Sequence, residues 1–124
     1  MNKHEIGKIG EKYAGEFLIS QNYGILEKNF RTKFGEIDLI AKDHEKNETV
    51  FVEVKTRTSI FFGEPQDAVQ YFKRKKLLKT ALYFLNSSTE KRDLCWRMDI
   101  IAVKLEKSGK LKEITHFKNI LNGA

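Results

Sequence analysis

The sequence has very little cysteine, proline or histidine. Cys95 is the only cysteine and Pro65 the only proline among its 124 residues, and the three histidines lie far apart along the chain. A disulfide framework and a thiolate zinc cluster are excluded, because each needs several metal-ligating or thiol side chains at short spacing. We expect His4, His44 and His116 to lie on the surface.

Long apolar runs are also missing. No segment approaches the roughly 20 apolar residues that a membrane-spanning helix requires. The first residues run into a helical pattern without an apolar stretch of signal-peptide length. Together with the single cysteine, these features predict a protein of the reducing cytoplasm that does not bind membranes.

The composition is that of an ordered globular protein. Hydrophobic residues make up 40% and charged residues 32% of the chain. This apolar content suffices for a hydrophobic core that needs no disulfides or structural metal ions. The 23 Lys and Arg residues exceed the 17 Asp and Glu residues, so the formal charge is +6. We predict one domain over residues 1–124, with a charge compatible with a polyanionic partner.

Hydrophobic periodicity predicts an α/β fold. A helix is expected over residues 4–22, ended by Gly24, and a second helical region follows Pro65. In that region Ala68, Val69 and Phe72 are out of helical phase with Leu77, Leu78, Ala81, Leu82 and Leu85, which predicts a break near residues 73–76. Strands are expected over residues 24–30, 35–40, 51–55, 96–105 and 111–117, with loops at residues 56–64 and 86–92 and a turn at 108–110. The order predicts a mixed central sheet of about five strands flanked by helices.

The strands at 35–40 and 51–55 are the most informative part of the chain. The polar tract between them is short enough for a hairpin, and folding it about its midpoint pairs residues whose numbers sum to 91. Asp38 then faces Glu53 and Glu36 faces Lys55. The opposite face, which we expect to be core, carries only apolar residues: Ile37, Leu39, Ala41, Val50, Val52 and Val54.

Two directly opposed carboxylates destabilise a sheet unless a positive charge lies between them. Mg²⁺ or Mn²⁺ suits Asp38 and Glu53, since both ions prefer hard oxygen ligands. Lys55 shares the face of Glu53 because the period of a strand is two, and cation, water and ammonium together are suited to phosphodiester hydrolysis. The alternative is a half-solvated charged face, and a pairing shifted by one residue would separate the two acids.

Other charged residues lie where they can support such a site. Glu11 falls at the edge of the apolar helical stripe and can reach over the sheet, or it can be a boundary glutamate whose stem packs on the core. For nucleic-acid phosphates the candidates are Arg31, Arg57, Lys73, Arg74 and Lys76, with Lys33 and Lys79 nearby. A solvated helix face is the alternative for the lysine run.

The motifs also resemble those of a known family. The similarity rests on Gly10-Glu11, Asn29-Phe30-Arg31, Gly35-Glu36-Ile37-Asp38-Leu39-Ile40, Phe51-Val52-Glu53-Val54-Lys55-Thr56-Arg57, Phe62-Gly63 and Arg97-Met98-Asp99. Together these resemble the YraN-like family of small bacterial proteins. That family is similar to the restriction-endonuclease-like superfamily with its PD-(D/E)xK signature, especially its Holliday-junction-resolvase-like members.

The resemblance implies a restriction-endonuclease-like core and specific roles. Asp38 matches the first acidic metal ligand, and Glu53 and Lys55 match the (D/E)xK pair. Glu11 matches a glutamate that some members contribute from the first helix, which implies a catalytic role and a third metal ligand. Ile37 stands where the signature has proline. The implied function is a Mg²⁺- or Mn²⁺-dependent endonuclease acting on DNA, including branched DNA, with a homodimer as one form. A non-catalytic nucleic-acid-binding module and a protein-docking domain are the alternatives.

Overall fold

The computed structural model describes residues 1–58, 71–87 and 95–121, with the side chains of the second helix described from Lys76 onward. Two helices and five strands make up this part of the chain. They are α1 (Lys3–Ser20), β1 (Tyr23–Thr32), β2 (Gly35–Asp43), β3 (Glu48–Thr58), α2 (Tyr71–Ser87), β4 (Trp96–Leu105) and β5 (Leu111–Phe117). The predicted α/β class with a five-stranded mixed sheet is confirmed.

The five strands form one sheet in the order β1-β2-β3-β4-β5. All neighbours are antiparallel except β3 and β4, which are parallel over Thr49 to Thr58. The parallel pair requires a crossover, and α2 lies in that connection. The β2–β3 hairpin therefore occupies the middle of the sheet, as the sequence predicts.

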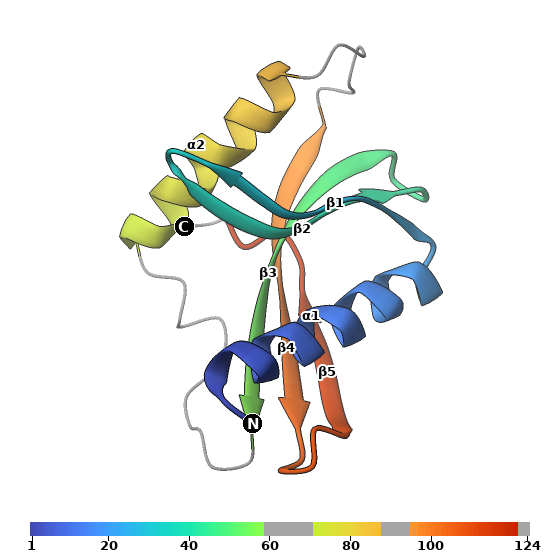
Figure 1. Ribbon diagram of the computed structural model, residues 1–124. Coiled ribbons are helices and arrows are strands. Elements are labelled where there is room, and N and C mark those ends of the chain that lie inside the picture. The colour runs from blue at the N-terminus through green and yellow to red at the C-terminus, as the bar shows by residue number, and fades with distance from the viewer. Residues whose placement is uncertain (59–70, 88–94, 122–124) are drawn as a thin grey trace.

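The helices lie on opposite faces of the sheet (Figure 1). On the α1 face the buried residues are Ala14, Leu18, Tyr23, Leu39, Ala41, Val50, Val52, Ile101, Val103 and Leu105. On the α2 face they are Ile37, Ile40, Phe51, Leu77, Ala81, Phe84, Met98, Ile100. Both faces of the central strands are thus buried, which explains their nearly continuous hydrophobic runs.

Helix α1 begins with a side-chain cap and ends at Ser20, two residues before the predicted end. The Asn2 side chain accepts a hydrogen bond from the backbone N–H of Glu5, which satisfies one of the free donors of the first turn. At the other end Asn22 has a φ of 68°, a left-handed conformation that asparagine tolerates. Gly24 was expected to stop the helix, and that expectation is wrong, because Gly24 lies within β1.

Gly10 lets α1 approach β3 closely. A Cβ at this position would overlap the side chain of Thr56. The low helix propensity of glycine is therefore offset by a contact between helix and strand that no larger residue permits. Thr56, which we expected in a loop, belongs to β3 together with Arg57 and Thr58.

The predicted break near residues 73–76 is also wrong, because α2 is continuous from Tyr71 to Ser87. Leu77, Ala81 and Phe84 form its buried stripe. The break was inferred from the different phase of Ala68, Val69 and Phe72. Ala68, Val69 and the side chain of Phe72 lie outside the described part of the chain. The expected loop at residues 59–64 and most of that at 86–92 lie outside them as well.

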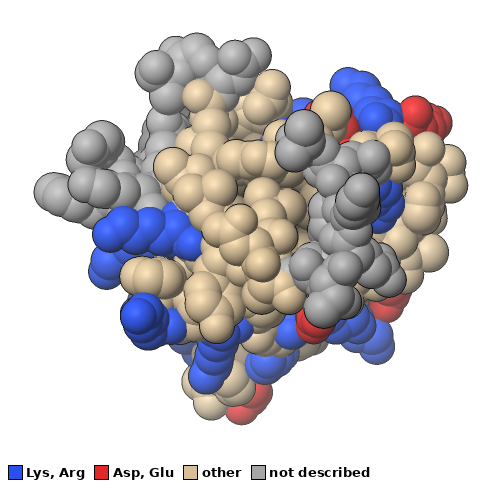
Figure 2. Space-filling view, turned by 90° about the horizontal axis from the view of Figure 1, so that it is seen from above, with Lys and Arg blue, Asp and Glu red and all other residues tan. Residues whose placement is uncertain are grey.

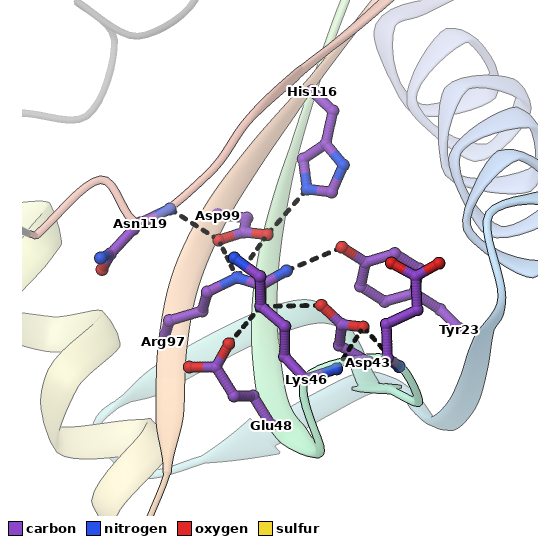
Figure 3. Close-up of polar contacts among 9 residues, drawn as sticks. Tyr23, Asp43, Lys46, Glu48, Arg97, Asp99, His116 and Asn119 are labelled. Carbon is purple, nitrogen blue, oxygen red and sulfur yellow. Dashed lines mark hydrogen bonds and ion pairs between the residues drawn. The ribbon is translucent and has the colours of Figure 1, made fainter.

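A buried polar network around Arg97 joins residues of all five strands (Figure 3). The Arg97 guanidinium donates to Asp99, to Asp43 at 3.0 Å, to Glu48 at 2.8 Å and to the Tyr23 hydroxyl at 2.7 Å. His116 Nε2 lies 2.7 Å from Asp99. These contacts lower the pKa of Asp99 and of Asp43, although burial alone would raise both.

His116 corrects one sequence expectation. Its side chain is only 7% exposed, and it lies against Asp99 instead of on the surface. His4 and His44 are exposed as expected. In the described segments no helix has the length and apolar character needed to cross a membrane.

Candidate functional site

The predicted register of the β2–β3 hairpin is confirmed. Leu39 pairs with Val52, Ile40 with Phe51, and the pairing continues to Asp43 and Glu48. Every pair sums to 91, so the polar tract forms the turn where the sequence places it. Asp38 and Glu53 are the next positions in the same register.

The two strands part at these positions. Pairing between β2 and β3 covers Leu39 to Asp43, yet β2 extends back to Gly35 and β3 continues to Thr58. The early part of β2 stays with β1, and the late part of β3 stays with β4. Figure 1 shows β1 and β2 turning away from the end of β3. The sheet therefore forks at Asp38, and backbone groups of β3 beyond the fork face the gap.

A cleft of about 540 Å³ opens at this fork beneath the first half of α1. We call it the acidic cleft. Its lining consists of Lys3, Ile6, Gly7 and Glu11 from α1, Asp38 from β2 and residues 53–57 from β3. The four candidate residues Glu11, Asp38, Glu53 and Lys55 thus come together from three elements, and Arg57 lies with them.

At the fork, the side chain of Asp38 provides the hydrogen-bond acceptor that a neighbouring strand would otherwise give to β3. Its carboxylate oxygen Oδ2 accepts a hydrogen bond of 2.8 Å from the backbone N–H of Val54. Burial and then the nearby charge of Glu53 raise the pKa of Asp38 to about 7, even though that hydrogen bond opposes the shift. A carboxylate with such a pKa is poorly neutralised by the protein around it.

Glu53 and Lys55 form an ion pair on β3. Lys55 Nζ lies 3.2 Å from Glu53 Oε1, and the two side chains are 13% and 9% exposed. Because they are two residues apart on one strand, they project to the same side. The predicted strand pair of Glu36 with Lys55 is absent, because the β2–β3 pairing ends at Leu39 and Val52. Glu36 pairs instead with Arg31 of β1 and lies 3.4 Å from its guanidinium.

Glu11 reaches the cleft from α1, as its place at the edge of the helical stripe predicts. Burial and the charges of Glu36 and Glu53 raise its pKa, while Lys8 at 3.9 Å opposes the shift. Asn29, which is not among the predicted site residues, also contacts the carboxylates of Glu11 and Glu36. With its amide nitrogen facing the carboxylates, Asn29 donates to Glu36 at 3.1 Å and to Glu11 at 3.2 Å.

A signal for Asn29 does exist in the sequence. It interrupts an otherwise strand-like segment with a residue that tolerates left-handed φ, and its φ is 51°. In the register of β1 with β2 it stands at the level of Asp38, between the pairs Lys28–Leu39 and Phe30–Ile37. The same irregular stretch explains Ile37, which packs on the α2 face and not, as predicted, with Leu39 and Ala41.

The predicted phosphate-binding residues lie in two places. Arg57 lines the acidic cleft. Arg31 and Lys33 are exposed near the β1–β2 turn, and Lys76 and Lys79 are exposed on α2. The side chains of Lys73 and Arg74 lie outside the described residues. We call Arg31, Lys33, Lys76 and Lys79 the hairpin surface.

The turn and α2 are held together at this surface. The ammonium groups of Lys33 and Lys79 lie 5.3 Å and 5.8 Å from the ring centre of Phe34, and Gly35 faces Thr80 and Lys76. Figure 2 shows basic side chains around a largely uncharged area on one face of the molecule. Gly35 is three residues before Asp38, so about 10 Å of strand separates the turn from the acidic cleft.

The acidic cleft fits a divalent cation in its donor chemistry. Asp38 and Glu53 offer hard carboxylate oxygens, and burial together with the charge of Glu53 disfavours the charged form of Asp38 in the metal-free protein. Across residues 1–58, 71–87 and 95–121, no three His, Cys, Asp or Glu side chains are grouped closely enough to hold a metal ion. Two carboxylates would therefore supply the protein ligands, as Mg²⁺ sites with several retained waters allow.

Comparison with known proteins places the chain in a family. Residues 10–103 match the model of the Uncharacterised protein family UPF0102. The chain belongs to UPF0102. A UPF0102 protein of Caldanaerobacter subterraneus subsp. tengcongensis is 47% identical over 120 residues, covering 96% of each chain. A UPF0102 protein of Thermodesulfovibrio yellowstonii is 47% identical over 119 residues, covering 96% of this chain and 97% of its own.

The UPF0102 match contains the whole candidate site. Glu11, Asp38, Glu53 and Lys55 all lie between residues 10 and 103. A third UPF0102 protein, from Caldicellulosiruptor saccharolyticus, is 43% identical over 119 residues. The family resemblance inferred from the motifs is therefore confirmed at the level of UPF0102.

Proposed function

We propose that this protein is a Mg²⁺- or Mn²⁺-dependent endonuclease with a restriction-endonuclease-like core, which hydrolyses phosphodiesters in DNA, including branched DNA. The observation that carries the proposal is the meeting of Asp38, Glu53 and Lys55 in one cleft at the fork of the sheet. The likeness of these three residues to the PD-(D/E)xK signature supports it. Fold alone does not, since one fold serves many functions.

Asp38 and Glu53 would hold the cation, with Glu11 at the same cleft to orient water. When bound, the cation would neutralise phosphate charge and lower the pKa of a coordinated water. The Val54 N–H fixes one oxygen of Asp38, which leaves its second oxygen available. Buried carboxylates with no cation between them would repel a phosphate, so the ion and the substrate are expected to bind together.

Lys55 and Arg57 would act on the phosphate itself. Both alternate with Val54 and Thr56 along β3 and line the cleft. The Lys55 ammonium, held 3.2 Å from Glu53, can donate to a phosphate oxygen and stabilise the charge that grows as water adds to phosphorus. One phosphorus–oxygen bond forms and another breaks, giving a phosphomonoester and a hydroxyl. The hairpin surface would hold phosphates farther along the strand.

Cleavage by the Asp38→Ala variant tests the proposal. Wild-type protein with Mn²⁺ is expected to cut duplex, single-stranded or four-way-junction DNA, and Asp38→Ala is expected to lose at least about 100-fold in rate because an essential ligand is gone. Asp43→Ala, at the other end of the same strand, controls for destabilisation. Cleavage that Asp38→Ala retains would overturn the proposal.

Binding of Mn²⁺ gives an independent readout. An ion that binds the folded state raises the melting temperature, and Glu53→Gln should abolish that increase. Salt-sensitive DNA binding without cleavage or metal stabilisation would favour the alternative function, a non-catalytic binding module. That alternative draws on the basic residues alone. Cutting both strands of a duplex would further require two copies of the cleft, as in a homodimer.

A further inference from the structure

A second hollow lies beside the acidic cleft, between α1 and β1. Its volume is about 350 Å³, and we call it the α1/β1 groove. Glu11 lines both hollows, so the groove continues from the cleft around this one side chain. Asn29, which donates to Glu11, also lines it.

The groove has a basic rim and an apolar floor. Lys8, Lys12 and Lys28 are all exposed and stand along it. Ile25 and Ile19 line it with Leu39, and Ile19 is 61% exposed. The two acids of its lining are Glu16 and Glu11, and Glu11 is already bound by Asn29 and Lys8. The rim therefore favours an anion, while the floor favours flat apolar surfaces.

Gly15 leaves the groove open in the middle of the helix. A Cβ at Gly15 would meet no atom within 4 Å. Glycine weakens a helix interior, and at Gly10 the close contact with Thr56 explains it. Packing within the described chain explains no such need at Gly15. The missing side chain of Gly15 keeps the groove open, so that a bound chain can approach the helix backbone closely.

We propose that the α1/β1 groove guides a single nucleic-acid strand away from the acidic cleft. The inference rests on the proposed function, which it deepens by naming the substrate class. A groove between one helix and one strand admits one nucleic-acid strand but not a duplex. Phosphates would contact Lys8, Lys12 and Lys28, and base faces would lie on the apolar floor. The substrate is then a nucleic acid with an unpaired segment beside the cut site.

Binding measured without metal tests this inference separately from cleavage. Fluorescence anisotropy would compare a labelled single-stranded DNA of about 15 nucleotides with the matching duplex, in EDTA. Gly15→Phe fills the groove and is expected to weaken single-strand binding at least about tenfold, with duplex binding within about twofold. Gly15→Ala, which adds only a methyl group, is the matched control and should bind normally.

A charge change provides the second arm. Lys12→Glu combined with Lys28→Glu should weaken single-strand binding more than a control pair of charge reversals does. The slope of affinity against salt concentration should fall by the equivalent of about two phosphate contacts. The matched control is Lys107→Glu with Lys112→Glu, since both lysines are exposed and neither lines the groove or the acidic cleft. Melting temperature checks that each variant is folded, and if Gly15→Phe fails this check the lysine pair decides.

The outcomes separate the two proposals. Unchanged single-strand affinity in Gly15→Phe and in the Lys12→Glu, Lys28→Glu variant would overturn the proposed role of the groove, even if wild-type protein cleaves DNA. Selective loss of single-strand affinity in these variants supports the groove. If wild-type protein shows no metal-dependent cleavage, or if Asp38→Ala retains it, that same selective loss still identifies a strand-binding groove.

Discussion

Asp38 combines two properties at the scale of a single residue. Its carboxylate completes the hydrogen bonding of β3 through the Val54 N–H, yet its pKa is raised to about 7 by burial and by Glu53. The folded protein therefore binds a proton at Asp38 more tightly than the unfolded chain does. Stability from this proton is fully present below about pH 4 and is lost as the pH rises through about 7.

Asp38→Asn should reveal this pH dependence. The amide oxygen can still accept from Val54 but carries no charge, so the metal-free variant is expected to gain on the order of 2 kcal/mol over wild type at pH 8 and much less at pH 5. Urea unfolding at both pH values measures the difference. Asp43→Asn is the opposite control, since Arg97 lowers the pKa of Asp43, and it should lose stability at pH 8. An equal effect of Asp38→Asn at both pH values would contradict the assignment.

The sequence predicts part of the site because that part is local. Asp38, Glu53 and Lys55 belong to one hairpin, whose period of two and short turn define the register. Asn29 and the Arg31–Glu36 contact depend on how β1 pairs with β2 and on a positive φ within β1. No hydrophobic pattern encodes such an irregularity, so these contacts appear only in the structure.

At the scale of elements, the position of α1 depends on its glycines. Gly10 allows contact with Thr56 of β3, whereas Gly7 and Gly15 have open space where a Cβ would lie. Gly10 therefore differs from Gly7 and Gly15 in the close contact that it permits, although each of the three weakens the helix by about the same amount in isolation. Substitution by alanine reveals this difference.

Gly10→Ala is expected to destabilise the fold by about 1–3 kcal/mol, because the methyl group overlaps Thr56 and pushes α1 away from β3. Gly7→Ala, in the same helix, should instead stabilise it by up to about 1 kcal/mol. Thermal unfolding of both variants gives the comparison. Restoration of Gly10→Ala by Thr56→Gly would show that the overlap is the cause, and an unaffected Gly10→Ala would refute it.

Element boundaries show where pattern analysis fails. The strands at residues 96–105 and 111–117 were predicted with the bounds that the structure shows. Helix α1 ends two residues before the predicted boundary, because Asn22 adopts a left-handed conformation that ends the helix without glycine. In α2 the break was inferred from a change of phase, yet the described helix keeps a single buried stripe from Leu77 to Phe84.

At the scale of the molecule, the Arg97 network fastens the central hairpin to the rest of the sheet. Arg97 begins the buried part of β4 and binds Asp43 and Glu48, which flank the hairpin turn. Asp99 extends the network to His116 of β5 and to the Asn119 backbone N–H at 2.8 Å. Each buried acid has a cationic or hydrogen-bonding partner, so removing the guanidinium leaves several charges unneutralised.

Arg97→Met should cost about 3–5 kcal/mol at pH 7. Because the pKa values of Asp43 and Asp99 are lowered in the fold, this stabilisation is present above about pH 4 and is lost as the pH falls further. The deficit should therefore shrink in acid. Lys104 lies on the same strand as Arg97 and forms an exposed ion pair with Glu113 of β5, so Lys104→Met should cost less than about 1 kcal/mol. Urea unfolding over a pH series measures both, and equal costs would contradict a structural role for the network.

The contact of Gly10 with Thr56 also determines how the acidic cleft responds to motion. Glu11 and Lys55 are the immediate chain neighbours of these two residues, so the carboxylate and the ammonium sit beside the point where the helix touches the sheet. If α1 tilts about this contact, the two ends of the helix move farthest and Glu11 moves least. The hollows on either side can then widen or narrow while Glu11 and Lys55 keep their spacing.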